Sequence, residues 1–143
     1  MSDRFCQDGA DAAALAHAYA AAVDARDLAA LRDLFTPTGT LVTTQLDDSR
    51  QRYEGHAGLA GVIAALTPFE RTLHAIDAVT ARGGGERARL TVDCTAHHVR
   101  GAVDVVLRIR YDDDCERGGD GRWRFASRRL RVLEQRLEQA LGL

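Results

Sequence analysis

The second half of the sequence predicts four long β-strands joined by short turns. β-Branched residues and apolar–polar alternation, both typical of strands, run through residues 71–82, 87–99, 102–111 and 122–133. The glycine-rich residues 83–86 and the pair at 100–101 are expected to form tight turns, and the acidic residues 112–121 a loop. Consecutive strands with such short connections pair antiparallel. An antiparallel sheet is therefore the dominant expected feature of the fold.

The first half of the sequence predicts three helices. Residues 9–24 are alanine-rich with apolar residues at helical spacing, and Asp27 is placed to cap a second helix over residues 28–35. Residues 55–68 predict the third helix. A short terminal helix is expected over residues 134–143, which hold two leucines four positions apart.

Two shorter strands, residues 39–46 and 51–55, complete the pattern. Helices and short strands thus come first and four long strands follow. This order indicates the α+β class, with three helices packed on one face of a curved antiparallel sheet. No linker, repeat or low-complexity segment interrupts residues 1–143, so we expect them to form one domain.

The tight turn at residues 100–101 allows the register of one hairpin to be predicted. With a two-residue loop, His98 lies opposite Val103 and shares its face with apolar neighbours. The other face then carries His97 opposite Asp104. We expect His98 to point into the core or pocket and His97 to the outer face, an assignment that a β-bulge would reverse.

The basic residues restrict the chemistry, because all 19 of them are arginine and the chain has neither lysine nor asparagine. Without lysine, Schiff-base catalysis and a P-loop are excluded. Without asparagine, N-glycosylation and a Cys-His-Asn triad are excluded. The net charge of -2 argues against nucleic acid or an anionic membrane as the partner.

The cysteines and histidines carry no pattern of a disulfide framework or a metal site. Cys6, Cys94 and Cys115 are widely spaced, which predicts reduced thiols in a cytoplasmic protein. An apolar targeting segment and a membrane-spanning stretch are both missing from the sequence. His97 and His98 are adjacent on a strand, so their side chains diverge and cannot chelate one ion. We expect no metal and no cofactor.

Four segments together carry a resemblance to a known family: YAAAVDARDLAALRDLF (19–35), YEGHAGLAGVIAAL (53–66), RTLHAID (71–77) and GRWRFASRRLRV (121–132). In this order they resemble the nuclear transport factor 2-like superfamily, in particular SnoaL-like proteins of the scytalone dehydratase, bile-acid dehydratase and lindane dehydrochlorinase type. The resemblance implies a cone-shaped, cystatin-like α+β barrel, in which a curved sheet wraps around three N-terminal helices. It also implies a pocket at the open end and a homodimer across the sheet.

The resemblance implies catalytic residues as well. In the dehydrating members an aspartate on the first helix orients a strand histidine, and the matching positions are Asp24 and His74. A carboxylate that holds one imidazole nitrogen leaves the other free to act as a base. Tyr19 matches a tyrosine near the leaving group. The His97–His98 pair matches a third polar residue, for which the hairpin register favours His98.

The pocket is expected to bind a small apolar molecule. The expected substrate-binding residues are His97, Val105, Leu107 and Phe125. The expected function is a cofactor-independent, dehydratase-like lyase or isomerase acting on an apolar cyclic or polyketide-like substrate. His74 would remove a proton α to a carbonyl.

Other roles are open for the same residues. His98 or Tyr19 would protonate or hold a departing hydroxyl or an enolate oxygen. A SnoaL-like polyketide cyclase and a non-catalytic small-molecule-binding module are the alternative functions. The binding module predicts that Asp24 and His74 lie beyond hydrogen-bond reach. In that case Asp24 would serve as a helix cap and His74 as a hydrogen-bonded core histidine.

Overall fold

The computed structural model describes residues 2–141, and their side chains from residue 7 onward. The Cys6 thiol, predicted to be reduced, lies outside these described side chains. The elements are α1 (Ser2–Asp24), α2 (Leu28–Asp33), β1 (Phe35–Thr44), β2 (Arg50–Glu54), α3 (Gly55–Gly58), α4 (Ala60–Ala65), β3 (Arg71–Gly84), β4 (Arg87–Arg100), β5 (Val103–Arg117) and β6 (Trp123–Gln139).

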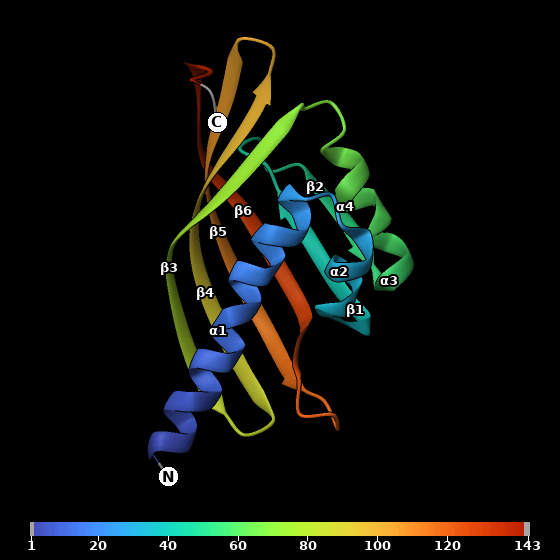
Figure 1. Cartoon of the computed structure of the whole chain (residues 1–143), viewed down its shortest axis with the longest axis vertical. Helices are drawn as coiled ribbons and strands as arrows, with labels where there is room; N and C mark the ends of the chain where they lie inside the picture. Colours follow the sequence, from blue (N-terminus) through green and yellow to red (C-terminus); the bar gives the residue numbers. More distant parts are fainter. Residues whose placement is uncertain (1, 142–143) are drawn as a thin grey trace.

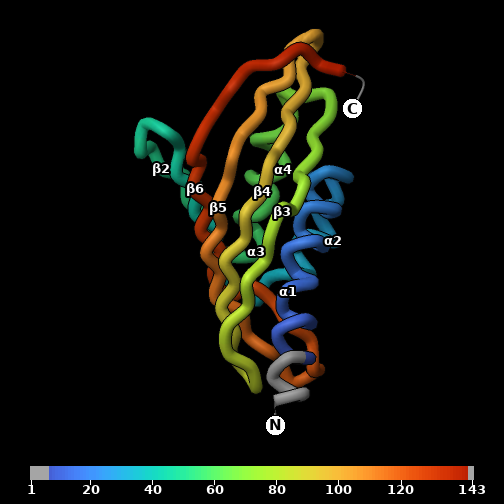
Figure 2. Tube along the Cα trace, turned by 90° about the vertical axis from the view of Figure 1, so that its left-hand side faces the viewer, coloured from blue at the N-terminus to red at the C-terminus, as the bar shows by residue number. Residues whose placement is uncertain are grey.

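The strands form a six-stranded sheet in the order β2-β1-β6-β5-β4-β3. The neighbouring strands are antiparallel except for β1 and β6, which are parallel. Figure 1 shows the long α1 lying across one face of this sheet, with α3 and α4 beside β1 and β2. Turned by a right angle, Figure 2 shows the sheet as one layer and α1 with α2 as the other. The expected α+β class, with helices on a curved sheet, is confirmed.

One face of α1 holds the helix against the sheet. Its buried residues recur at helical spacing and include Ala12, Leu15, Ala16, Tyr19 and Val23. They share one core with inward-facing strand residues, among them Val92, Cys94, Ala96, Ile109 and Tyr111. In residues 2–141 no helix is both long and apolar enough to cross a membrane.

The helices after α1 follow the prediction in part. The Asp27 carboxylate caps α2 as predicted, since it accepts a hydrogen bond from the Ala30 backbone N–H at 3.0 Å. The helix ends at Asp33 rather than at residue 35, because Phe35 already pairs with Phe125 of β6. The predicted third helix is divided at Leu59 into the short helices α3 and α4.

The prediction of a C-terminal helix over residues 134–143 is wrong where the structure describes it. Residues up to Gln139 continue β6, which pairs with the beginning of β5. Leu137 and Leu141, the two leucines on which the prediction rested, are 67% and 83% exposed. A helix there would bury no apolar face, whereas the extended strand satisfies its backbone hydrogen bonds along β5.

The expected acidic loop is wrong in its first half. Residues 112–117 extend β5, and the loop begins only after Arg117. Three aspartates in a row are tolerated in this strand because arginines lie near each of them. Asp112 lies opposite Arg129 and Asp113 opposite Arg128. Asp114 lies opposite Ser127 and forms ion pairs with Arg89 and Arg129.

The β4–β5 hairpin has the predicted faces but not the predicted pairs. His98 lies opposite Val105 rather than Val103, because the loop is formed by Gly101 and Ala102. Gly101 has a φ of 60°, the left-handed conformation that glycine adopts most readily. A shift of two residues leaves each side chain on the same face of the sheet, so His98 still points inward.

Candidate active site

A cavity of about 300 Å³ opens between the inner face of the sheet, the end of α1 and the α4 segment. Its apolar wall includes Val105 and Leu107, both predicted, together with Ile109, Leu130 and Val132. Its polar residues are Tyr19, Thr43, Gln45, Tyr53, His74, His98, Tyr111 and Gln135. The volume lies at the lower end of the range for ligand sites, which suits a small molecule.

His74 of β3 is held by Asp24, the last residue of α1, at two points. The His74 ring Nδ1 lies 2.7 Å from Asp24 Oδ1, and the His74 backbone N–H donates to Asp24 Oδ2 at 2.8 Å. Both side chains are largely buried, and His74 lines the cavity while Asp24 lies behind it. A carboxylate only accepts, so the Nδ1–H is the donor, and in the neutral ring Nε2 is then the unprotonated nitrogen that can act as a base.

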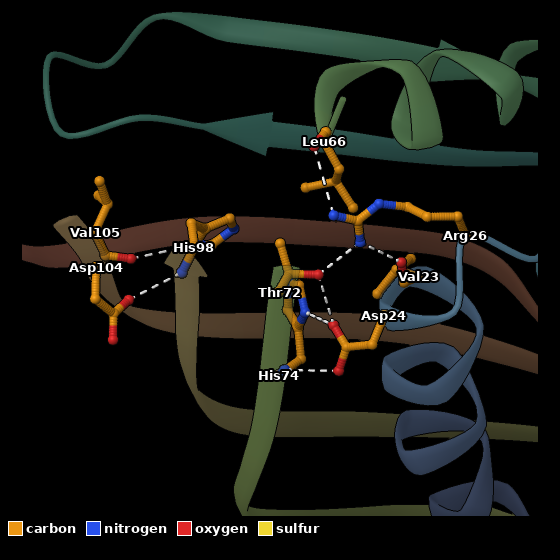
Figure 3. Close-up of polar contacts among 9 residues, drawn as sticks. All are labelled: Val23, Asp24, Arg26, Leu66, Thr72, His74, His98, Asp104 and Val105. Atoms are coloured by element: carbon orange, nitrogen blue, oxygen red, sulfur yellow. Dashed lines mark hydrogen bonds and ion pairs between the residues drawn. The ribbon is translucent and has the colours of Figure 1, made fainter. Parts of the chain in front are cut away.

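A second layer of hydrogen bonds supports the carboxylate (Figure 3). The Thr72 hydroxyl donates to Asp24 Oδ1 at 2.9 Å, and Arg26 Nη1 donates to Thr72 Oγ1 at 2.6 Å. Because a guanidinium only donates, the Thr72 hydroxyl must give its own proton to Asp24. Burial alone would raise the pKa of Asp24, but the hydrogen bonds from His74 and Thr72 outweigh it and lower the pKa. Asp24 therefore remains a carboxylate.

Arg26 connects this network to the helical side of the cavity. Its guanidinium also donates to the Val23 carbonyl at 2.8 Å and to the Leu66 carbonyl at 3.5 Å. Leu66 follows α4 and lines the cavity. Arg26 has a φ of 57°, a left-handed conformation that is costly for a residue with a Cβ. Neither Arg26 nor Thr72 was predicted as a site residue, because their side chains meet across 46 positions of sequence.

His98 of β4 is a neutral neighbour of His74. Its ring centroid lies 5.5 Å from that of His74 and 5.0 Å from that of Phe69. Burial, followed by the proximity of His74, lowers the pKa of His98 to about 4. The His98 Nδ1–H donates to the Val105 carbonyl at 3.3 Å, so Nε2 is the unprotonated nitrogen. At neutral pH His98 is an acceptor at Nε2 rather than an acid.

Lowering the pH from 7 to 4 is expected to destabilise the protein partly through His98. The unfolded chain binds a proton near the ordinary pKa of 6.5 and the folded chain near 4. The free energy of unfolding therefore falls through this window, by up to about 1.4 kcal/mol per pH unit for one group.

Urea unfolding at several pH values tests this contribution. His98→Gln should show a shallower loss of stability between pH 6.5 and 4. The lowered pKa of Asp24 and the raised pKa of Asp113 act in both proteins, so their contributions cancel in the comparison. Equal slopes would show that the folded protein does not resist protonation of His98.

Tyr19 lies in the floor of the cavity within an aromatic cluster. Its ring centroid is 6.3 Å from that of Phe35 and 6.2 Å from that of Phe125. Burial raises the pKa of Tyr19 to about 12, so its hydroxyl stays protonated. Phe125 is itself fully buried and does not line the cavity, which corrects its predicted substrate-binding place.

A buried ion pair lies behind this floor and was missed from the sequence. The Arg128 guanidinium carbon is 4.2 Å from the centre of the Tyr19 ring and 3.7 Å from that of Tyr111. Arg128 Nε donates to Asp113 Oδ1 at 3.0 Å, and neither side chain has any exposed surface. Burial, opposed by Arg128, raises the pKa of Asp113 to about 6.

His97 lies outside the cavity, which corrects its predicted role in substrate binding. Its Nδ1 is 2.7 Å from Asp104 Oδ2. The outer-face partnership with Asp104 is as expected, although the residue opposite His97 is Val106. The Asp104–His97 pair repeats the contact of Asp24 and His74 on the other face of the sheet.

Two glutamines at the cavity, Gln45 and Gln135, were not predicted as site residues either. Gln135 fell in the predicted terminal helix, and only its pairing with Leu107 on β5 places it on the cavity wall. No signal in the local sequence marks it. Nowhere in the described residues do three or more His, Cys, Asp or Glu side chains come together to hold a metal ion.

Comparison with known proteins agrees with this architecture. The family model of the SnoaL-like domain matches residues 5–129, whereas no curated protein matches the chain. A proposed scytalone dehydratase from Novosphingobium aromaticivorans is 18% identical over 99% of this chain and 94% of its own, with a TM-score of 0.82.

Two further solved structures share the fold. Hexachlorocyclohexane dehydrochlorinase LinA-type3 from Novosphingobium barchaimii is 16% identical, covers 99% of this chain and 92% of its own, and has a TM-score of 0.73. An NTF2-like protein with a cystatin-like fold from N. aromaticivorans is 18% identical, covers 90% and 84%, and has a TM-score of 0.73. The expected cystatin-like fold is thereby confirmed.

Proposed function

Because the chain belongs to the SnoaL-like domain family, we propose that it is a cofactor-independent lyase or isomerase of the dehydratase type. His74 removes a proton α to the carbonyl of a small, mostly apolar cyclic substrate, and Asp24 orients His74. The observation that carries the proposal is the double attachment of His74 to Asp24 beside an apolar cavity. Two structural neighbours support the class, since a dehydratase expels water and a dehydrochlorinase expels HCl.

Each step of the reaction is assigned to one of the side chains at the cavity. His74 Nε2 takes the α-proton, the electron pair of the C–H bond moves to the carbonyl oxygen, and Asp24 stabilises the resulting imidazolium. The protonated Tyr19 hydroxyl donates to the enolate oxygen. In a dehydration the carbonyl then re-forms, the β-carbon–oxygen bond breaks, and His74 returns its proton to the departing hydroxide as water. His98 Nε2 accepts a hydrogen bond from that hydroxyl and orients it.

Proton removal can be tested without the natural substrate. A set of cyclic ketones that includes 4-phenylcyclohexanone is incubated with the protein in D₂O, and loss of the α-proton signals is followed by NMR. Exchange above the buffer rate is expected, and its absence with every ketone contradicts the proposal. A cyclase also begins with α-proton removal, so the two activities are separated by the mass of the product formed from a β-hydroxyketone. The product of dehydration has lost one water, whereas the product of cyclisation has the mass of the substrate.

Thr72→Val is expected to lower the exchange rate about tenfold, because it removes one hydrogen bond to the Asp24 carboxylate at nearly constant volume. Thr72→Ser keeps the hydroxyl and should restore most of the rate. The pH profile of exchange distinguishes a positioning role from a structural one, since Thr72→Val removes one of the hydrogen bonds that lower the pKa of Asp24. Equal rates and profiles for the valine and serine variants would contradict the positioning role.

A further inference from the structure

The cavity presents no net positive charge to a ligand. Among the described residues, its lining contains no aspartate, glutamate or arginine, and His98 and Tyr19 are both neutral at neutral pH. The Asp24 carboxylate lies behind His74, and Arg128 is neutralised by Asp113 beneath the floor. A ligand anion would enter without a counter-charge, and burying an unpaired charge is costly. The cavity is therefore suited to an uncharged molecule.

Apart from three tyrosines, the polar groups of the cavity lie on two opposite walls. His74 and His98 lie on β3 and β4, whereas Gln45 and Gln135 lie on or beside β1 and β6. The wall between these ends is apolar and comes from β5 and the middle of β6: Val105, Leu107, Ile109, Leu130 and Val132. A molecule that fills the cavity thus meets polar groups at both of its ends.

The strand register places His74 and Gln135 at the same level of the sheet. His74 is paired with Ala96, Ala96 with Leu107, and Leu107 with Gln135. Three strand spacings separate the two backbones by roughly 14 Å along the sheet. Their side chains both face the cavity from a curved sheet and converge, which leaves room for an apolar body of one or two rings.

The Gln135 amide is available to a ligand. No other side chain or backbone group of the described residues bonds to it, in contrast to Asp24 and Thr72, whose polar atoms are committed to the network behind His74. An amide offers both a donor and an acceptor, so it can bind either a hydroxyl or a carbonyl oxygen.

We infer that the site selects an uncharged, two-ended substrate, a cyclic ketone whose second oxygen lies at the far end of an apolar body and is bound by Gln135. The assignment of the ketone to the histidine end rests on the proposed function. The selection of the far oxygen rests on the lining and register alone, and makes Gln135 the residue that determines specificity.

Three probes of one shape test the inference: 4-phenylcyclohexanone, its 4-hydroxyphenyl analogue and its 4-carboxyphenyl analogue. Their dissociation constants are measured by calorimetry or NMR titration. We expect the hydroxyl to tighten binding about three- to tenfold over the unsubstituted ring, as one neutral hydrogen bond allows. The carboxylate should bind at least about tenfold more weakly than the unsubstituted ring.

Gln135→Leu should reduce the advantage of the hydroxyl to about one, whereas the matched variant Gln139→Leu, on the same strand outside the cavity, should keep it. The inference is overturned if the carboxylate binds best, or if Gln135→Leu keeps the advantage of the hydroxyl.

The same titrations with His74→Ala separate this inference from the proposed function. Suppose that the three probes keep their order of affinity in His74→Ala, and that neither this variant nor the unsubstituted protein exchanges the α-proton. The catalytic proposal would then be rejected and the role of Gln135 kept. If the unsubstituted protein exchanges the α-proton but does not prefer the hydroxyl probe, the catalytic proposal is kept and the role of Gln135 is rejected.

Discussion

His74→Ala is expected to slow α-proton exchange into a cyclic ketone by about a hundredfold to ten-thousandfold, the contribution typical of a positioned general base. Among the described residues, His74 is the only hydrogen-bond partner of Asp24 that lines the cavity. Asp24→Asn should lose nearly as much, because an amide in place of the carboxylate no longer stabilises the imidazolium. Exchange is measured by NMR in D₂O at equal concentrations of folded protein.

The outer face of the sheet offers a matched control for this experiment. His97→Ala breaks an aspartate–histidine contact of the same 2.7 Å length outside the cavity. This variant controls for the structural cost of losing such a pair. Its exchange rate should stay within about twofold of that of the unsubstituted protein, a much smaller change than removal of a general base causes. Retention of exchange in His74→Ala would reject the mechanism. A loss of exchange in both variants would attribute the effect to the fold.

Arg128→Ala is expected to cost about 3–5 kcal/mol of the free energy of unfolding, because it leaves the Asp113 carboxylate buried without its partner. The guanidinium also packs on the aromatic rings of the cavity floor, and that packing is lost with it. Urea unfolding at neutral pH measures the change. A cost below about 1 kcal/mol, the value for solvent-exposed pairs, would show that water reaches this pair.

Two further variants sharpen the measurement. Arg129→Ala removes an exposed neighbour that pairs with Asp114 at 3.6 Å, and should cost less than about 1 kcal/mol. The double variant Arg128→Met with Asp113→Leu should recover most of the stability, since apolar side chains of similar volume replace both charges. Failure of the double variant to recover would assign the cost to lost packing rather than to the unpaired carboxylate.

The sequence predicted the helices and strands that build the cavity better than the pairs between them. His98 was placed on the inner face although its partner was wrong by two residues, because side chains alternate with a period of two along a strand. The end of the chain was harder to predict. Leucine spacing favoured a helix, and only a tertiary contact, the pairing with β5, makes residues 134–139 a strand.

Residues that depend on tertiary contacts escaped prediction for the same reason. Gln135 was missed together with its strand. Arg128 was missed because a register shift between Asp114 and Cys115 changes which side chains of β6 face inward, and Arg128 is fully buried. The geometry of Asp24 and His74 agrees with the resemblance, but the supporting contacts of Arg26 and Thr72 join segments that no local pattern connects.

The parallel pairing of β1 with β6 has a consequence for the order in which the chain folds. Residues of the first strand, Phe35–Thr44, pair with residues 125–131 of the last. During synthesis β1 therefore has, within the described sheet, only the short β2 as a partner until residues 125–131 have left the ribosome. The aspartate and the histidine can meet earlier, whereas the wall with Gln135 arrives last, and closing so long a loop is the slow step of a fold with distant contacts. The contact between Asp24 and His74 can thus form before the cavity beside it is complete.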